Sequence, residues 1–137
     1  MKTPKEIVSH MLGQDEFSNW LGIVVLEVRQ GYCKIKIDLR HEMLNGFQIA
    51  HGGITYSLAD SALAFASNTY GFQCVSIETS ISHVLKVGGD DVLIAEAVEI
   101  YRGTKTAIYE VRVQNQYEAL VALFKGTVFI TQKEWEF

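Results

Sequence analysis

Near the N-terminus, the apolar positions recur at helical intervals. Between residues 7 and 12 they fall on one face of a helix. Thr3 and Glu6 have the spacing of a capping box, and Pro4 suits the first helical turn. Gly13 is a suitable residue for the C-terminal end. We therefore expect a short N-terminal helix that packs on the body of the protein.

From about residue 20 the period of the pattern changes to two. Residues 33–39 alternate apolar and polar side chains, which predicts a strand with one face toward solvent. Gln30-Gly31 has the composition of a turn between this strand and the apolar run at 23–26. Asn45-Gly46 marks another turn farther along the chain.

The longest helical pattern covers residues 53–70. Apolar residues occupy nearly its whole circumference, so this helix should be buried, and Gly71 ends it. After the helix, short breaks separate runs with strand character, which predicts hairpins and an antiparallel sheet. The four expected strands are 74–87, 91–102, 105–115 and 119–131. One buried helix beside such a sheet predicts an α+β fold in which the sheet wraps around the helix.

The composition narrows the class of protein. A length of 137 residues fits one domain, residues 1–137, and 48% hydrophobic with 20% charged residues is typical of a folded core. The net charge of −4 argues against a nucleic-acid partner, which needs a basic surface. No apolar run approaches the ~18 residues of a membrane span, and the N-terminus lacks the apolar core of a signal peptide. We expect Cys33 and Cys74 to be reduced thiols and the protein to be cytoplasmic.

Two adjacent glycines at the start of the long helix are the first sign of a site. Gly52 and Gly53 cost stability in a helix, and a tight entry turn is one explanation for them. The other is a ligand that approaches the first backbone N–H groups, which lack helical acceptors and carry the positive end of the helix dipole. A carbonyl oxygen bound there would be polarised, as in an oxyanion hole. Asn45 and His51, just upstream, either hold the turn or belong to the site.

Asp60 is the only side chain between residues 52 and 70 that is charged at neutral pH. A carboxylate in an apolar helix costs free energy unless it is paired or used, so Asp60 is a candidate catalytic group; a partly exposed aspartate is the alternative. Gly53 and Asp60 lie on about the same helical face, roughly 10 Å apart. Either side chains and substrate bridge this gap, or Asp60 acts on a substrate held by a second subunit. We favour the second explanation, a two-fold dimer with shared sites.

Motifs of other enzyme classes are absent from the sequence. The histidines lack the spacing of metal ligands, and there is no G-x-S-x-G elbow, Walker loop or dinucleotide fingerprint. We therefore expect neither a metal nor a cofactor.

At these residues the chain resembles the hotdog-fold thioesterases, and within them the phenylacetic-acid-degradation type of acyl-CoA thioesterase. The resemblance extends from about residue 17 to residue 130. It is carried by Asn45-Gly46, His51-Gly52-Gly53, Leu58-Ala59-Asp60-Ser61, Asn115-Gln116 and Val121-Ala122-Leu123-Phe124-Lys125-Gly126.

The resemblance implies a hotdog fold, a homodimer with shared active sites and a further pairing into a tetramer. It implies hydrolysis of an acyl-CoA with an aromatic or a short to medium acyl group. Gly52 would polarise the carbonyl, Asn45 would hold substrate or water, and Asp60 of the other subunit would act as base or nucleophile. CoA would lie near the segment Arg102-Gly103-Thr104-Lys105, for which an ordinary charged hairpin is the alternative.

The chain departs from the family pattern after Ser80-Ile81. Where relatives often have Asp-Phe and then Arg-Pro, this chain has Ser82-His83 and then Leu85-Lys86-Val87. Lys86 is therefore the candidate cation for CoA. Ser76 and Ser80 are candidates for the serine that some relatives place near the catalytic water.

Two other functions are compatible with the same fold. A non-catalytic acyl-CoA-binding module would have little need of a buried carboxylate at Asp60. A hotdog hydratase would need a histidine positioned for proton transfer. His51 before the helix and Asp60 within it match the thioesterase pattern better.

Overall fold

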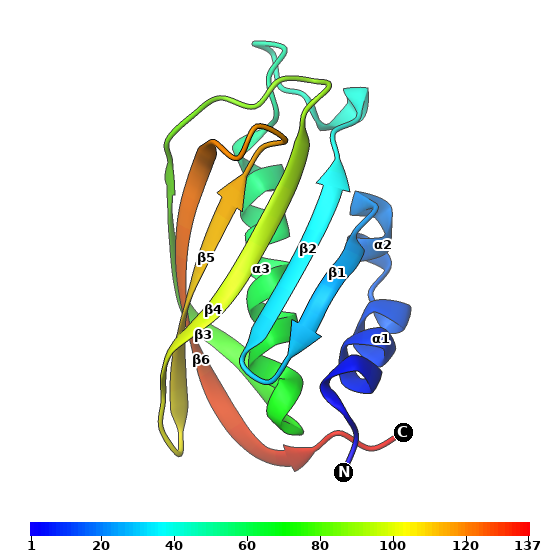
Figure 1. The fold of residues 1–137 in the computed structure, drawn as a ribbon, viewed down its shortest axis with the longest axis vertical. Coiled ribbons are helices and arrows are strands. Elements are labelled where there is room, and N and C mark those ends of the chain that lie inside the picture. The colour runs from blue at the N-terminus through cyan, green and yellow to red at the C-terminus, as the bar shows by residue number, and fades with distance from the viewer.

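A computed structural model describes residues 1–137 and shows a six-stranded antiparallel sheet curved around one long helix (Figure 1). The helix is α3 (Gly52–Ser67), which a 3-10 turn at Asn68–Tyr70 extends. The strands are β1 (Val24–Arg29), β2 (Tyr32–Asp38), β3 (Phe72–His83), β4 (Val92–Arg102), β5 (Thr106–Gln114) and β6 (Leu120–Glu134). The predicted α+β hotdog fold is confirmed.

Strand β3 lies at one edge of the sheet although it follows α3 directly in the chain. The strand order is β1-β2-β4-β5-β6-β3, and every pairing is antiparallel. β3 pairs with β6 alone, and its other edge is open. Residues 84–91 then carry the chain back to β4 across the end of the sheet (Figure 1). There the backbone N–H of Ala50 donates to the carbonyl of Val87 at 2.8 Å, so this connection lies beside the start of α3.

The core lies between α3 and the inner face of the sheet. Because strand side chains alternate in direction, every second residue of β2, β4, β5 and β6 is buried against the helix. Ala95 and Ala97 on β4 and Ala107 on β5 are small, which lets the helix lie close to the sheet. The largest side chains of this core are Ile35, Ile37, Leu58, Leu63, Phe65, Leu93, Tyr109 and Phe124. None of the helices combines the length and the hydropathy that crossing a bilayer requires.

The N-terminal region contains one more helix than the pattern predicted. α1 (Pro4–Gln14) has the expected capping box, with the backbone N–H of Glu6 and the Thr3 hydroxyl 3.2 Å apart. A second helix, α2 (Glu16–Leu21), occupies part of the region expected to have strand periodicity. Six residues are too few to show a helical period, but Asp15 caps this helix, and Gly22 ends it at a φ of 80°.

The bounds of β3 and β6 also differ from the prediction. The expected strand 74–87 begins at residue 72 and ends at His83, so Lys86 lies in the connection to β4. β6 continues to Glu134, three residues beyond its expected end. An apolar run does not by itself reveal where strand pairing stops, because pairing depends on the neighbouring strand.

We expect Gly126 to be required for the contact between β6 and α3. A Cβ at this position would overlap the buried side chain of Leu63 and lie 3.2 Å from Phe124 Cε1. Gly126→Ala should therefore lower the free energy of unfolding by about 1–3 kcal/mol in urea titrations. In a Leu63→Ala background, where the overlapping side chain is removed, Gly126→Ala should lower the free energy of unfolding much less. An equal cost in both backgrounds would contradict this explanation.

Candidate active site

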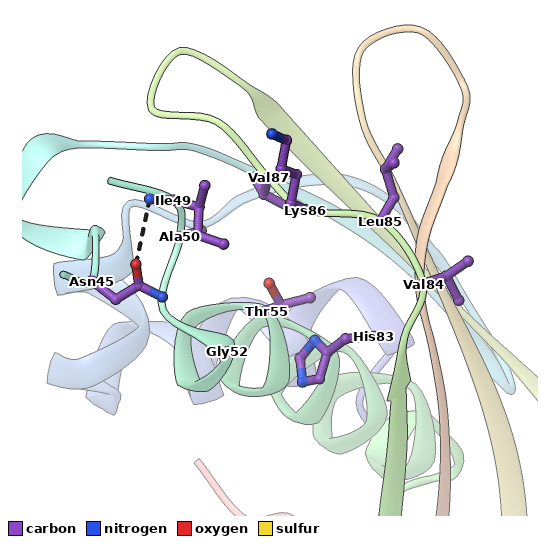
Figure 2. Close-up of a pocket in the computed structure, with 10 residues that line it drawn as sticks. All are labelled: Asn45, Ile49, Ala50, Gly52, Thr55, His83, Val84, Leu85, Lys86 and Val87. Carbon is purple, nitrogen blue, oxygen red and sulfur yellow. Dashed lines mark hydrogen bonds between the residues drawn. The ribbon is translucent and has the colours of Figure 1, made fainter. Parts of the chain in front are cut away.

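A cavity of about 260 Å³ opens at the N-terminal end of α3 (Figure 2). Three segments that are distant in sequence surround it: the loop before α3, the first turn of α3, and the end of β3 with the connection that follows. The lining residues are Asn45, Ile49, Ala50, Gly52, Thr55, His83, Val84, Leu85, Lys86 and Val87. The structure therefore brings together Asn45, Gly52 and Lys86 of the predicted site.

The two glycines differ in what their N–H groups do. The N–H of Gly53 donates to Nδ1 of His51 at 3.0 Å. The N–H of Ile54 donates to the carbonyl of His51 at 2.9 Å. The N–H of Gly52 has no acceptor in the chain and stands at the positive end of the helix dipole. Gly52 is therefore the donor that remains for a ligand, whereas Gly53 serves the helix cap.

His51 holds the entry to α3. Its side chain is the N-cap, and its backbone N–H donates to the carbonyl of Met43 at 2.9 Å. Because Nδ1 accepts from Gly53, the neutral ring carries its proton on Nε2. The geometry matches the turn-holding explanation for His51, which is exposed and does not line the cavity.

Asn45 presents its amide nitrogen to the cavity. Its Oδ1 accepts from the backbone N–H groups of Phe47 at 2.9 Å and Ile49 at 3.4 Å. The Nδ2 group is then left to donate, and Figure 2 shows it pointing toward the start of α3. The loop is closed by the N–H of Asn45 donating to the carbonyl of Ile49 at 2.8 Å and includes Gln48 at a φ of 62°. A non-glycine residue in this conformation is uncommon, so the loop maintains a specific shape.

Asp60 lies two helical turns farther along α3. Its half-buried carboxylate makes no hydrogen bond or ion pair within the chain, and burial raises its pKa above the ordinary value of 3.8. It does not line the cavity at Gly52. Eight residues of helix separate the two positions by about 12 Å. One chain therefore does not bring the carboxylate to the free amide.

The two candidate serines of β3 also lie outside the cavity. Thr79 faces α3, where its hydroxyl lies 2.5 Å from that of Tyr56. Because neighbours on a strand point in opposite directions, Ser80 faces away from the helix, beside its pairing partner Lys125. Ser76 pairs with the buried Val128 and is exposed, nearer the other end of β3.

The predicted CoA segment lies at the opposite end of the molecule from Gly52. Arg102, Gly103 and Thr104 form the β4–β5 hairpin and help to line a second cavity of about 320 Å³. The guanidinium of Arg102 lies over the ring of Tyr70, 3.8 Å from its centroid. Lys105 is exposed beside this cavity. The length of α3, about 24 Å, separates the hairpin from Gly52 within one chain.

Sequence reasoning missed two polar residues that line the first cavity, Thr55 and His83. Thr55 is buried in the first turn of α3. His83, at the end of β3, has its Nε2 3.4 Å from where a Cβ on Gly52 would lie. His83 lacks the spacing of a metal ligand, and no local motif marks it. The feature of the sequence that could have indicated His83 as a site residue is its position in the segment that departs from the family pattern.

Comparison with known proteins agrees with this fold. Residues 47–122 match the family model described as Thioesterase superfamily. The acyl-coenzyme A thioesterase PaaI of Escherichia coli is 34% identical over 116 residues, which cover 85% of this chain and 83% of PaaI. The structure of the E. coli PaaI protein from the phenylacetic acid degradation operon covers 96% of this chain and 95% of its own at a TM-score of 0.94, with 30% identity. The protein smu.793 of Streptococcus mutans, solved with acetyl CoA, is 26% identical at a TM-score of 0.80 and covers 82% of this chain and 91% of its own.

A sheet wrapped around one long helix is the hotdog fold, and the matches to the thioesterase family model and to an acyl-coenzyme A thioesterase identify the class as thioester hydrolase. The family model covers more than half of the chain, and the chain therefore belongs to the thioesterase superfamily. The resemblance to the phenylacetic-acid-degradation type, inferred from the motifs around Asn45 and Asp60, is confirmed.

We expect Asp60 to destabilise the protein at neutral pH. Because the pKa of Asp60 is higher in the folded state than in the unfolded state, the folded protein binds the carboxyl proton more tightly. The free energy of unfolding therefore falls as the pH rises from the unfolded-state pKa of 3.8 through the raised pKa of the folded state. Asp60→Asn should therefore be more stable than wild type at pH 7, and the difference should shrink at pH 3. Urea unfolding at both pH values measures this, with Asp38→Asn, at an exposed position of β2, as the control. A constant difference would contradict the prediction.

Proposed function

We propose that residues 1–137 form one catalytic domain that hydrolyses acyl-CoA to a free acid and CoA. The observation that carries the proposal is the unused N–H of Gly52 at the mouth of a cavity, in a chain of the thioesterase superfamily. Two relatives support CoA as the carrier: one is named an acyl-coenzyme A thioesterase, and the other was solved with acetyl CoA.

The size of the cavity indicates which part of the substrate it takes. At about 260 Å³ it is below the range of roughly 300–1,000 Å³ typical of drug-sized ligands. Ile49, Ala50 and Val87 give it apolar walls. It therefore suits an aromatic or a short to medium acyl group, while CoA extends outside. Lys86, exposed at the rim, is placed to contact a phosphate of CoA.

The polar groups supply the elements of thioester hydrolysis. The thioester carbonyl oxygen accepts from the N–H of Gly52, and Nδ2 of Asn45 holds the substrate or the attacking water. As the water oxygen bonds to the carbonyl carbon, its proton passes to Asp60 and the π pair moves to the carbonyl oxygen. When the intermediate collapses, the C–S bond breaks, and the CoA thiolate takes the proton from Asp60. Direct attack by the Asp60 carboxylate is the alternative route.

The open edge of β3 supports a dimer in which sites are shared. This strand has twelve residues, pairs on one side alone, and exposes Val75 by 55% and Ile77 by 60%. A long apolar edge is an aggregation hazard unless another strand pairs with it. Antiparallel pairing with β3 of a second copy would extend the sheet and place the two α3 helices side by side. Asp60 of each chain would then approach Gly52 of the other.

The same pairing would explain how a hairpin far from Gly52 in its own chain could contact CoA. Antiparallel β3 strands place the Phe72 end of one chain beside the His83 end of the other. The hairpin with Arg102, Gly103 and Thr104 would then approach the partner's cavity, where CoA leaves it. We further propose that these dimers pair into tetramers and act in the cytoplasm, where the free thiols Cys33 and Cys74 stay reduced.

Hydrolysis of acyl-CoA tests the proposed function. Wild-type protein should release free thiol from aromatic, short-chain or medium-chain acyl-CoA. Asp60→Asn should lower turnover by about 10²-fold or more, because it removes the base or nucleophile. Unfolding curves serve as the folding control. A folded wild-type protein that hydrolyses none of these substrates, or an Asp60→Asn variant with normal turnover, would overturn the proposal.

Complementation between inactive variants tests whether the sites are shared. Gly52→Val should be inactive because its side chain occupies the position of the substrate carbonyl, although the Cβ itself makes an ordinary 3.4 Å contact with His83. Mixed with Asp60→Asn under conditions of subunit exchange, it should recover about a quarter of wild-type activity. Half the dimers are then mixed, and each has one intact site. Mixed dimers verified by mass that show no activity would place both groups in one chain's site.

A further inference from the structure

His83 is a polar side chain at the cavity that the proposed mechanism does not use. It ends β3, lines the cavity at Gly52, and its exposed imidazole makes no hydrogen bond within the chain. Figure 2 shows the ring lying against the first turns of α3, between β3 and Gly52. Both ring nitrogens are therefore available to a bound molecule.

The distance between His83 and Gly52 suits two donors to one oxygen atom. Nε2 of His83 is 3.4 Å from the position of a Cβ on Gly52, and this ring atom is the nearest of the side chain. The amide nitrogen and Cβ of one residue are about 2.5 Å apart, so Nε2 lies within about 6 Å of the Gly52 nitrogen. Two hydrogen bonds of about 2.9 Å that meet on a single oxygen span up to about 5.8 Å. An oxygen bound to the Gly52 amide is thus within reach of His83.

We propose that Nε2–H of His83 is the second hydrogen-bond donor to the thioester carbonyl oxygen, together with the N–H of Gly52. This inference rests on the proposed function. When water adds to the carbonyl carbon, the π pair moves to this oxygen, and both donors stabilise the negative charge without transferring a proton. When the C–S bond breaks, the carbonyl re-forms and the two hydrogen bonds weaken. The contact is stronger in the transition state than in the bound substrate, so His83 acts on turnover more than on binding.

Other polar groups at the cavity are less suited to this role. Lys86 lies in the connection after β3 and is the proposed contact to a phosphate of CoA. The loop backbone holds the Asn45 side chain through a hydrogen bond to Oδ1. Its Nδ2 group therefore points to the cavity from the loop before α3. Thr55 is buried in the helix. His83 lies across from the amide on a separate element, so an oxygen between them receives donors from two directions.

Two substitutions at His83 distinguish the effect of its hydrogen-bond donor from the effect of its ring shape. His83→Phe keeps a planar ring but removes the donor, and His83→Gln keeps an N–H group near Nε2. His83→Phe should lower kcat by about 10²-fold with KM changed less than about threefold, the loss typical of one oxyanion donor. His83→Gln should stay within about tenfold of wild type. Both variants should bind a thioether analogue of the substrate, which lacks the carbonyl, as tightly as wild type does.

The outcomes also distinguish this inference from the proposed function. If wild type hydrolyses acyl-CoA and His83→Phe keeps its kcat, or changes KM alone, the role of His83 is overturned and the proposed function stands. Equal losses in the Phe and Gln variants would likewise overturn the role as a donor. If wild type hydrolyses no acyl-CoA, the proposed function itself fails. Unfolding curves verify folding, and His83→Ala replaces His83→Phe if the larger side chain disturbs β3.

Discussion

The structure depends on the burial of α3. Nine of the sixteen residues of this helix are buried, and each large apolar side chain among them contributes about 1.5–3 kcal/mol relative to exposure. A flat sheet covers one side of a helix only, so the sheet must curve to bury so much of the surface. The N-terminal end of α3 opens into the cavity beside the end of β3, so the unused amide of Gly52, at the positive end of the dipole, is accessible there.

The cavity is assembled by backbone hydrogen bonds between segments that are distant in sequence. The bond from Ala50 to Val87 ties the loop before α3 to the connection after β3. The bond from His51 to Met43 and the cap on Gly53 hold the helix entry. Donors held in this way need little reorganisation when charge develops on a substrate oxygen, which is the condition for effective electrostatic catalysis. The loop around Asn45 thus contributes shape as well as a donor.

The proposed catalytic groups do not meet within one chain. Asp60 is half-buried without a partner, and β3 has an open edge, and each feature costs a lone chain something. The proposed two-fold pairing would relate the two features, because the pairing that covers the strand edge would also bring the carboxylate to the amide of the other subunit. It would likewise bring the Arg102 hairpin from the far end of one chain to the cavity of the other. The quaternary arrangement would then be a requirement of the chemistry.

Local patterns in the sequence were sufficient for most of the elements, and the motifs around α3 were sufficient for the family. Apolar periodicity predicted α1, α3 and the sheet, and the lone Asp60 on the helix that begins with Gly52-Gly53 is the basis of the proposed catalytic groups, because these signals depend on near neighbours in the chain. The short helix α2 was missed because six residues cannot show a period. Only the tertiary structure distinguished Gly52 from Gly53, turned Ser80 away from the helix and brought His83 to Gly52. These outcomes depend on which hydrogen bonds are already made and on strand pairing across tens of residues, and no local pattern encodes them.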